Sequence, residues 1–160
     1  MYRISSLAVS GLAPPGFDAV PQDFDLSLTD TPMPEAEAVI EAGLSAYNEA
    51  QAGYVDARAL TVLVRAAGGA VVGGLVGRTT LGLLFVDLIF LPEAARGHGL
   101  GGRVMAMAED EARRRGCTAA TLYTITFQAP DFYARRGYRE LGRIECAPPG
   151  ATRVCMAKPL

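Results

Sequence analysis

Seven consecutive residues, Arg96-Gly97-His98-Gly99-Leu100-Gly101-Gly102, have a composition that suits ligand binding. Their glycines accept positive φ and carry no side chain, so backbone N–H groups can turn toward one point and a ligand can approach closely. The apolar run 81–91 precedes this segment and a helical pattern follows it. A helix N-terminus adds unpaired N–H donors and partial positive charge. The segment therefore predicts an anion site that suits a pyrophosphate, with Arg96 as a charge-assisted partner.

Two common phosphate-binding motifs compete for this segment. Gly97, Gly99 and Gly102 satisfy the GxGxxG spacing of dinucleotide sites, but that motif expects an acidic residue near the end of the next strand. The corresponding stretch, 121–124, contains no acid. A P-loop requires Lys and then Ser or Thr after its last glycine, and here Arg-Val follows. A third interpretation is a loop that holds the pyrophosphate of coenzyme A.

Two motifs carry a resemblance to a known family. Arg96, Gly99 and Gly101 match the pattern Arg/Gln-x-x-Gly-x-Gly/Ala, and residues 132–138 (Phe-Tyr-Ala-Arg-Arg-Gly-Tyr) look like a Phe/Leu-Tyr-x-x-x-Gly-Phe/Tyr ending. With this order and separation, the chain resembles the GNAT superfamily of N-acetyltransferases from about residue 23 to residue 160.

The resemblance implies an α/β fold, the acyl-CoA N-acyltransferase (GNAT) fold. Its mixed central sheet has an antiparallel N-terminal meander and parallel, splayed central strands, flanked by helices. We expect a single domain at 23–160 after an irregular extension at 1–22. The resemblance also implies acetyl-CoA as cofactor and a homodimer formed through the last strands.

The family pattern further assigns roles to residues. Tyr133 would lie beside the thioester sulfur as a general acid. Where many members carry Asn before the short helix, this chain offers Gln128 or Thr126. The positions expected to bind the cofactor are Ile89, Phe90 and Leu91 through their backbone, the loop residues Arg96, Gly97, His98, Gly99, Leu100, Gly101 and Gly102, and Gln128.

Asp87 is the candidate general base, because it is the only charged residue inside the run 81–91. In a regular strand it shares a face with Phe85, Ile89 and Leu91. An unpaired carboxylate in a buried strand is costly, and this cost would make it a better proton acceptor. The alternative is an Asp that accepts hydrogen bonds and only holds structure or substrate.

The acceptor side of the site is predicted to lie at the end of the first helix and in the loop after it. Asn48 and Tyr54 are the candidates there, facing Tyr123 and Thr124 on a strand. Acidic neighbours, Glu49 and Asp56, would suit a cationic amine. A solvated polar loop explains each of these residues equally well.

Periodicity predicts the elements that position these residues. We expect Arg78-Thr79-Thr80 to form a turn, and an inward stripe of Leu100, Val104, Met107, Ala108 and Ala112 on the long helix. Helices are predicted at 35–52, 100–115 and 130–136, and strands at 24–28, 60–65, 70–76, 81–91, 118–126, 138–145 and 152–157. The unit formed by 81–91, 100–115 and 118–126 is a β-α-β crossover, which makes its two strands parallel.

Composition excludes several other classes of function. The net charge of −2 gives no electrostatic reason to expect a nucleic-acid partner, and no apolar run is long enough to cross a membrane. One histidine and three widely spaced cysteines are too few for a zinc site, so no metal is expected. Three thiols without a pairing pattern are typical of free, buried cysteines in a reducing cytoplasm.

The sequence thus predicts an acetyl-CoA-dependent N-acetyltransferase that acts by direct attack of an amine, borne by a small molecule or a peptide. A non-catalytic acyl-CoA-binding or sensor module of the same fold is the first alternative. A nicotinamide-dependent oxidoreductase is the second alternative.

Overall fold

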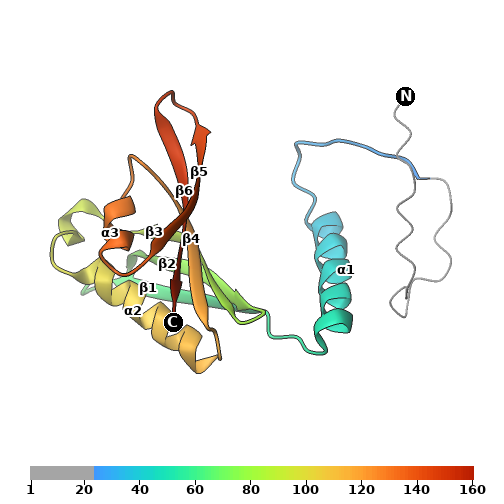
Figure 1. Cartoon of the computed structure of the whole chain (residues 1–160), viewed down its shortest axis with the longest axis horizontal. Helices are drawn as coiled ribbons and strands as arrows, with labels where there is room; N and C mark the ends of the chain where they lie inside the picture. The colour runs from blue at the N-terminus through green and yellow to red at the C-terminus, as the bar shows by residue number, and fades with distance from the viewer. Residues whose placement is uncertain (1–23) are drawn as a thin grey trace. The chain divides into compact units, whose positions relative to one another are not determined.

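The computed structural model describes residues 24–160, in two compact units that divide after Val55. The units comprise residues 24–55 and 56–160, and each is described by itself (Figure 1). The predicted extension at 1–22 lies outside the described residues. No helix of the described part is long and apolar enough to span a membrane.

The first unit contains one helix, α1 (Pro34–Ala52), as the sequence predicted. Pro34 occupies the first turn, and Gly53 ends the helix with φ 78° while its N–H donates to the carbonyl of Glu49 at 2.8 Å. The prediction of a strand at 24–28 is wrong, since these residues are exposed and belong to no strand of the described sheet. Alternating apolar residues form a strand only when a partner satisfies their backbone groups.

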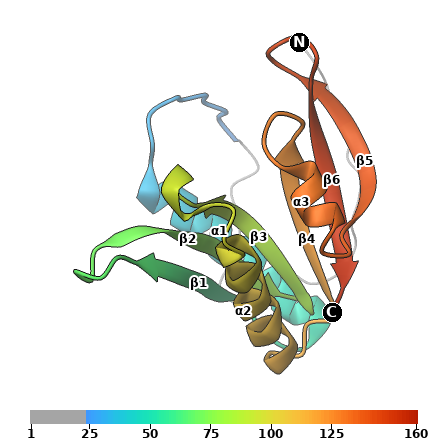
Figure 2. The same ribbon diagram turned by 90° about the vertical axis from the view of Figure 1, so that its left-hand side faces the viewer.

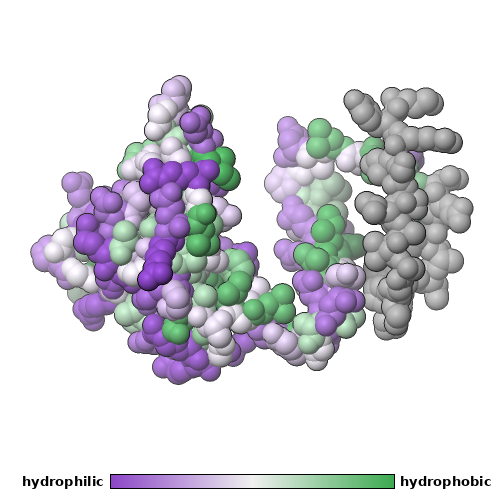
Figure 3. All heavy atoms as spheres, in the orientation of Figure 1, coloured by the Kyte–Doolittle hydropathy of each residue, from purple (hydrophilic) through white to green (hydrophobic). Residues whose placement is uncertain are grey.

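The apolar stripe of α1 remains at the surface of this unit. Its large members, Val39, Ile40, Leu44 and Tyr47, are all exposed, and the helix buries none of its residues. Figure 3 shows the result as green apolar spheres beside purple polar ones along the helix.

The strands of the second unit are β1 (Arg58–Arg65), β2 (Val71–Thr80), β3 (Leu83–Phe90), β4 (Ala119–Ile125), β5 (Arg139–Cys146) and β6 (Ala151–Pro159). They form one mixed sheet with the strand order β1-β2-β3-β4-β6-β5. Four pairs are antiparallel, namely β1–β2 and β2–β3 on one side of the sheet and β4–β6 and β6–β5 on the other, and the central β3–β4 pair is parallel. The mixed sheet expected from the sequence is therefore confirmed.

The β2–β3 hairpin differs from the prediction. Arg78, Thr79 and Thr80 continue β2, and the turn is instead Leu81-Gly82, with φ values of 48° and 74°. Two positive φ values match the right-handed twist of the strands in a two-residue turn. Asp56 fixes this turn, because its carboxylate accepts the amide of Leu81 at 2.7 Å and that of Gly82 at 3.3 Å.

Helix α2 (Leu100–Arg114) covers one face of the sheet at β1, β2 and β3, as Figure 2 shows. It buries Val104, Met105, Ala108 and Ala112 against the core strands, whereas Met107 is 60 % exposed. The predicted stripe is therefore wrong at Met107, where Met105 fills the inward position. The short helix α3 (Pro130–Ala134) follows β4, and the 3-10 turn η1 (Glu93–Ala95) follows β3.

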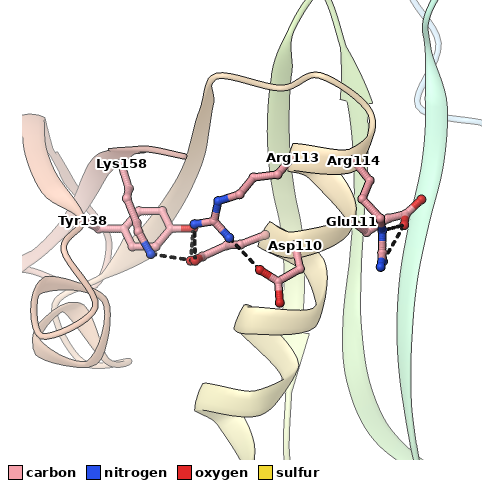
Figure 4. A network of polar contacts seen from close by, with 7 residues as sticks. Asp110, Glu111, Arg113, Arg114, Tyr138 and Lys158 are labelled. Atoms are coloured by element: carbon pink, nitrogen blue, oxygen red, sulfur yellow. Dashed lines mark hydrogen bonds and ion pairs between the residues drawn. The ribbon is translucent and has the colours of Figure 1, made fainter.

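A buried polar network joins α2 to the start of β5 and the end of β6 (Figure 4). Glu109 is 5 % exposed; its carboxylate accepts the hydroxyl of Tyr138 at 3.2 Å and the ammonium of Lys158 at 2.6 Å. Arg113 approaches the same carboxylate at 3.8 Å. A buried charge needs such partners, so the network fixes how the helix sits on the second half of the sheet.

All three cysteines are free. Cys117 is buried, as expected, and burial raises the pKa of its thiol. Cys146 and Cys155 are only half-buried, because they lie on strands with one face at the surface.

Candidate functional site

A cleft opens where β3 and β4 separate. Their parallel pairing covers only residues 83–86 of β3 and 119–122 of β4, although the strands continue to Phe90 and Ile125. Figure 2 shows the two ribbons diverging beyond this point. The cleft has a volume of about 1020 Å³ and is lined by β3, β4, α3, the start of α2 and the loop before it.

The divergence begins at a bulge in β3. Val86 pairs with Gly77 of β2 and Leu88 pairs with Val76, so Asp87 has no partner residue between them. A bulge bends its strand and increases the local twist. This extra residue turns the second half of β3 away from β4.

The glycine-rich loop forms one end of the cleft. Gly97 and Gly99 have φ values of 79° and 73°, and Gly99 is the N-cap of α2. Arg103 is the first residue of the helix to donate a backbone hydrogen bond, to the carbonyl of Gly99 at 3.1 Å. In the described chain, the amides of residues 97–102 have no acceptor, so they can serve an anion at the helix start.

Close packing and positive charge shape the same end. A Cβ on Gly101 would lie 3.3 Å from the ring of Phe132 and 3.4 Å from Leu91, which leaves little room for a side chain. Arg136 donates to the carbonyl of Gly102 and stacks over Phe132, with 5.2 Å from its guanidinium carbon to the ring centroid. The backbone, the small residues and the guanidinium groups of this end fit a ligand with several negative charges.

Nearly all loop residues predicted to bind a cofactor line the cleft. They are Arg96, Gly97, Gly99, Leu100, Gly101 and Gly102. Arg96 also donates from Nε to the carbonyl of Leu91 at 3.0 Å, which fixes the loop to the end of β3. His98 does not line the cleft, because its Nδ1 bonds the carbonyl of Arg96 at 2.7 Å within the loop.

The outer half of β3 forms one wall. Ile89 and Phe90 pair with Leu75 and Gly74 of β2 on one side, while their other backbone edge has lost β4. These residues and Leu91 line the cleft. A free strand edge offers main-chain donors and acceptors to an extended ligand.

Tyr133 on α3 directs its hydroxyl into the cleft. The residue is only 6 % exposed, and its ring packs edge-on against Phe132 and Tyr138, at centroid distances of 5.1 and 6.0 Å. Its hydroxyl makes no hydrogen bond within residues 24–160. Every buried polar side-chain atom of these residues does have a partner, so the hydroxyl oxygen is not buried and is accessible from the cleft that Tyr133 lines. Burial raises the pKa of Tyr133, which keeps the hydroxyl protonated near neutral pH.

The two candidates before α3, Gln128 and Thr126, lie in different surroundings. Gln128 lines the cleft; its side-chain oxygen accepts the amide of Ile125 at 3.1 Å and the hydroxyl of Thr124 at 3.4 Å. Its NH₂ group is left to serve a ligand. Thr126 instead accepts the amide of Thr152 at 3.1 Å and joins β4 to β6.

Asp87 lines the cleft, but its environment differs from the expected one. Its side chain is 40 % exposed and forms an ion pair with Arg78, whose guanidinium also lies over Phe85 at 4.8 Å. The prediction of a buried, unpaired carboxylate is therefore wrong, because Asp87 shares the exposed face of the sheet with Phe85, where Arg78 of β2 lies beside both. Asp87 is nevertheless the only carboxylate among the described residues that line the cleft.

The predicted acceptor residues divide into two groups. Tyr123 and Thr124 line the cleft, with Tyr123 exposed on the face opposite α2 and Thr124 buried on the other. Asn48 and Tyr54 belong to the first unit. Asp56, expected beside a cationic amine, instead binds the Leu81-Gly82 turn at the opposite end of β3.

Several residues that line the cleft were not predicted from the sequence. Phe127, Phe132, Arg135 and Arg136 follow β4 directly and lie in or near the recognised motif, so their positions in the chain were a usable signal. Arg153 also lines the cleft, from β6, and only the pairing of β6 with β4 brings it there.

Comparison with known proteins identifies the family. Residues 26–142 match the family model described as Acetyltransferase (GNAT) family. The chain belongs to the GNAT acetyltransferase family. Its fold is therefore the GNAT fold, as the sequence predicted.

Individual relatives agree with this assignment. The chain is 44 % identical over 117 residues to acetyltransferase Atu2258 of Agrobacterium fabrum, covering 73 % of this chain and 85 % of that protein. It is 45 % identical over 93 residues to blasticidin-S acetyltransferase of Streptomyces morookaense, covering 58 % of this chain and 68 % of that protein. A crystal structure described as an acetyltransferase from Agrobacterium tumefaciens superposes with a TM-score of 0.80 at 39 % identity, covering 86 % of this chain and all of that one.

Proposed function

We propose that this GNAT protein transfers the acetyl group of acetyl-CoA to an amine. The observation that carries the proposal is the cleft between β3 and β4, which has free helix N-terminal amides at one end and the hydroxyl of Tyr133 inside it. Membership of an acetyltransferase family and acetyltransferase relatives support the same reaction.

The residues of the cleft fit coenzyme A along its length. The amides of residues 97–102, with Arg96 and Arg136, would hold the pyrophosphate. The free edge of β3 at residues 89–91 would pair with the amide groups of the pantetheine arm. The NH₂ group of Gln128 would donate a further hydrogen bond from the facing side.

When bound, acetyl-CoA supplies an activated acetyl thioester. A backbone N–H on the free edge of β3 would donate to the acetyl oxygen and stabilise the negative charge that develops there. An amine must be neutral to attack, and Asp87 is the carboxylate in the cleft that could take its proton, directly or through water. Tyr133 holds a proton that it can donate to the departing sulfur.

A thiol-release assay tests the proposal. The intact protein is incubated with acetyl-CoA and a panel of amines, and free coenzyme A is measured together with the acetylated product by mass spectrometry. Amine-dependent release with matching product supports the proposal. Saturable binding of acetyl-CoA with no product from any amine would instead identify a binding or sensor module.

A further inference from the structure

A second hollow adjoins the cleft on the side of β4, β6 and β5. Its volume is about 210 Å³, and its walls include the apolar side chains of Leu141 and Ile144 from β5. Tyr123 of β4 and Arg153 of β6 line both this hollow and the cleft. These two residues therefore lie at the boundary where a molecule in the hollow would reach the cleft.

At this boundary Arg153 is a cation without a counter-ion among the described residues. Asp87, on the opposite wall, is paired with Arg78, and Arg143 in the hollow is held by both oxygens of Glu140, at 2.6 and 2.8 Å. Arg153 has no carboxylate within 4 Å among residues 24–160 and donates no side-chain hydrogen bond there. The acceptor end of the cleft thus carries an uncompensated positive charge.

The position of Arg153 separates it from the cations at the phosphate end. Arg96 and Arg136 are bonded to the carbonyls of Leu91 and Gly102, beside the start of α2. Arg153 lies instead on β6, where it pairs with Ile125 and is exposed. A guanidinium group is planar and binds a carboxylate through two parallel hydrogen bonds.

We propose that the acceptor is an amine that also carries a carboxylate, and that Arg153 binds this carboxylate. The ring of Tyr123, which is 61 % exposed, provides an apolar wall for the carbon skeleton between the two groups. The substrate class is then that of amino acids and related amino-carboxylates. The inference rests on the proposed function of the cleft and specifies its acceptor.

The test measures binding without turnover. Conjugates are prepared in which a CH₂–C=O bridge joins the sulfur of coenzyme A to the amine of glycine, β-alanine or leucine, each also as its carboxamide. Calorimetry on the intact protein compares each acid with its amide. A charge-assisted contact to the carboxylate should make at least one acid bind about 10- to 100-fold more tightly than its amide.

Variants of the arginine locate the effect. In Arg153→Gln, the affinities for the acid and the amide conjugate should differ by less than about 3-fold, and the affinity for coenzyme A alone should be unchanged. Arg153→Lys should retain part of the preference for the acid. Arg139→Gln is the matched control, because it removes the same charge from an exposed position on β5 that lines neither hollow.

Two results would overturn the inference. One is equal affinity for acid and amide in every pair, and the other is an acid preference that survives in Arg153→Gln. If coenzyme A itself did not bind, the proposed function would fail and the inference with it; if it bound and the acids had no advantage, only the inference would fail.

Discussion

At the scale of single residues, the chemistry of the cleft depends on where each side chain ends. Tyr133 has a buried ring and an accessible hydroxyl. Burial raises its pKa, so the hydroxyl stays protonated, and a ligand in the cleft can reach it. Asp87 is at the surface and paired with Arg78. The sequence motif was sufficient to predict that Tyr133 lies at the cleft, but the environment of Asp87 depends on Arg78, which only the pairing of β2 with β3 brings beside it.

The first prediction concerns Tyr133→Phe. Loss of the proton donor should lower kcat about 100-fold and change the KM for acetyl-CoA by less than about 3-fold. Because burial raises the pKa of Tyr133, the activity that needs its proton should persist through the ordinary tyrosine range near pH 10 and decline only above it. Initial-rate kinetics over a pH series measure both effects.

Tyr138→Phe is the control for that variant. Its ring contacts Tyr133, but its hydroxyl bonds Glu109 and does not line the cleft. It should keep kcat within about 3-fold while losing about 1 kcal/mol of stability from the missing hydrogen bond. A similar fall of kcat in both variants would mean that packing, not a proton, was lost.

The second prediction concerns Asp87→Asn. If the carboxylate accepts the amine proton, kcat at neutral pH should fall about 10-fold or more. Arg78→Gln removes the ion-pair partner but leaves the carboxylate, so it should keep kcat within a few fold. Equal losses in the two variants would show that the pair only shapes the wall of the cleft. Steady-state assays at saturating acetyl-CoA distinguish these outcomes.

At the scale of elements, the sequence predicted the main helices and the crossover because periodicity and glycine turns are local signals. The β2–β3 hairpin was misplaced, since Arg78, Thr79 and Thr80 resemble a polar turn whereas Leu81 does not. Asp56, 25 residues earlier, makes the Leu81 turn possible by accepting its amides. Such a long-range contact is not visible in local composition.

The third prediction follows from this turn. Leu81 adopts φ 48°, a conformation that asparagine accepts more readily than leucine, so Leu81→Asn should raise the free energy of unfolding by about 0.5–1 kcal/mol. Gly82→Ala should lower it by a similar amount or more, because its φ is 74°. Urea unfolding monitored by circular dichroism measures both, and stabilisation by both substitutions would contradict the observed turn.

The fourth prediction tests the network beneath α2. Glu109→Ala leaves the ammonium of Lys158 and the hydroxyl of Tyr138 without their partner, and should destabilise the fold by about 2–3 kcal/mol. Asp110 is the next residue along α2 and forms an exposed ion pair with Arg113, so Asp110→Ala should lower the free energy of unfolding by less than about 1 kcal/mol. Equal losses in urea unfolding would show that the buried carboxylate is not the joint between α2 and the last strands.

At the scale of the whole molecule, the order of the sheet brings distant segments to one cleft. The loop before α2 and Tyr133 were predictable because the family motifs contain them. Arg153 was not, since it reaches the cleft only through the register of β6 on β4. The homodimer expected from the family resemblance stays a prediction, which light scattering on the full chain can check.

The central claim is that the amides of residues 97–102 bind the pyrophosphate of coenzyme A. Calorimetry that compares acetyl-CoA with S-acetylpantetheine, which carries the same thioester but lacks the phosphates and the adenosine, tests it most directly. The account predicts that acetyl-CoA binds at least about 100-fold more tightly, because S-acetylpantetheine cannot make the charge-assisted contacts at the helix start. Equal affinity for the two compounds, or no binding of acetyl-CoA, would contradict it.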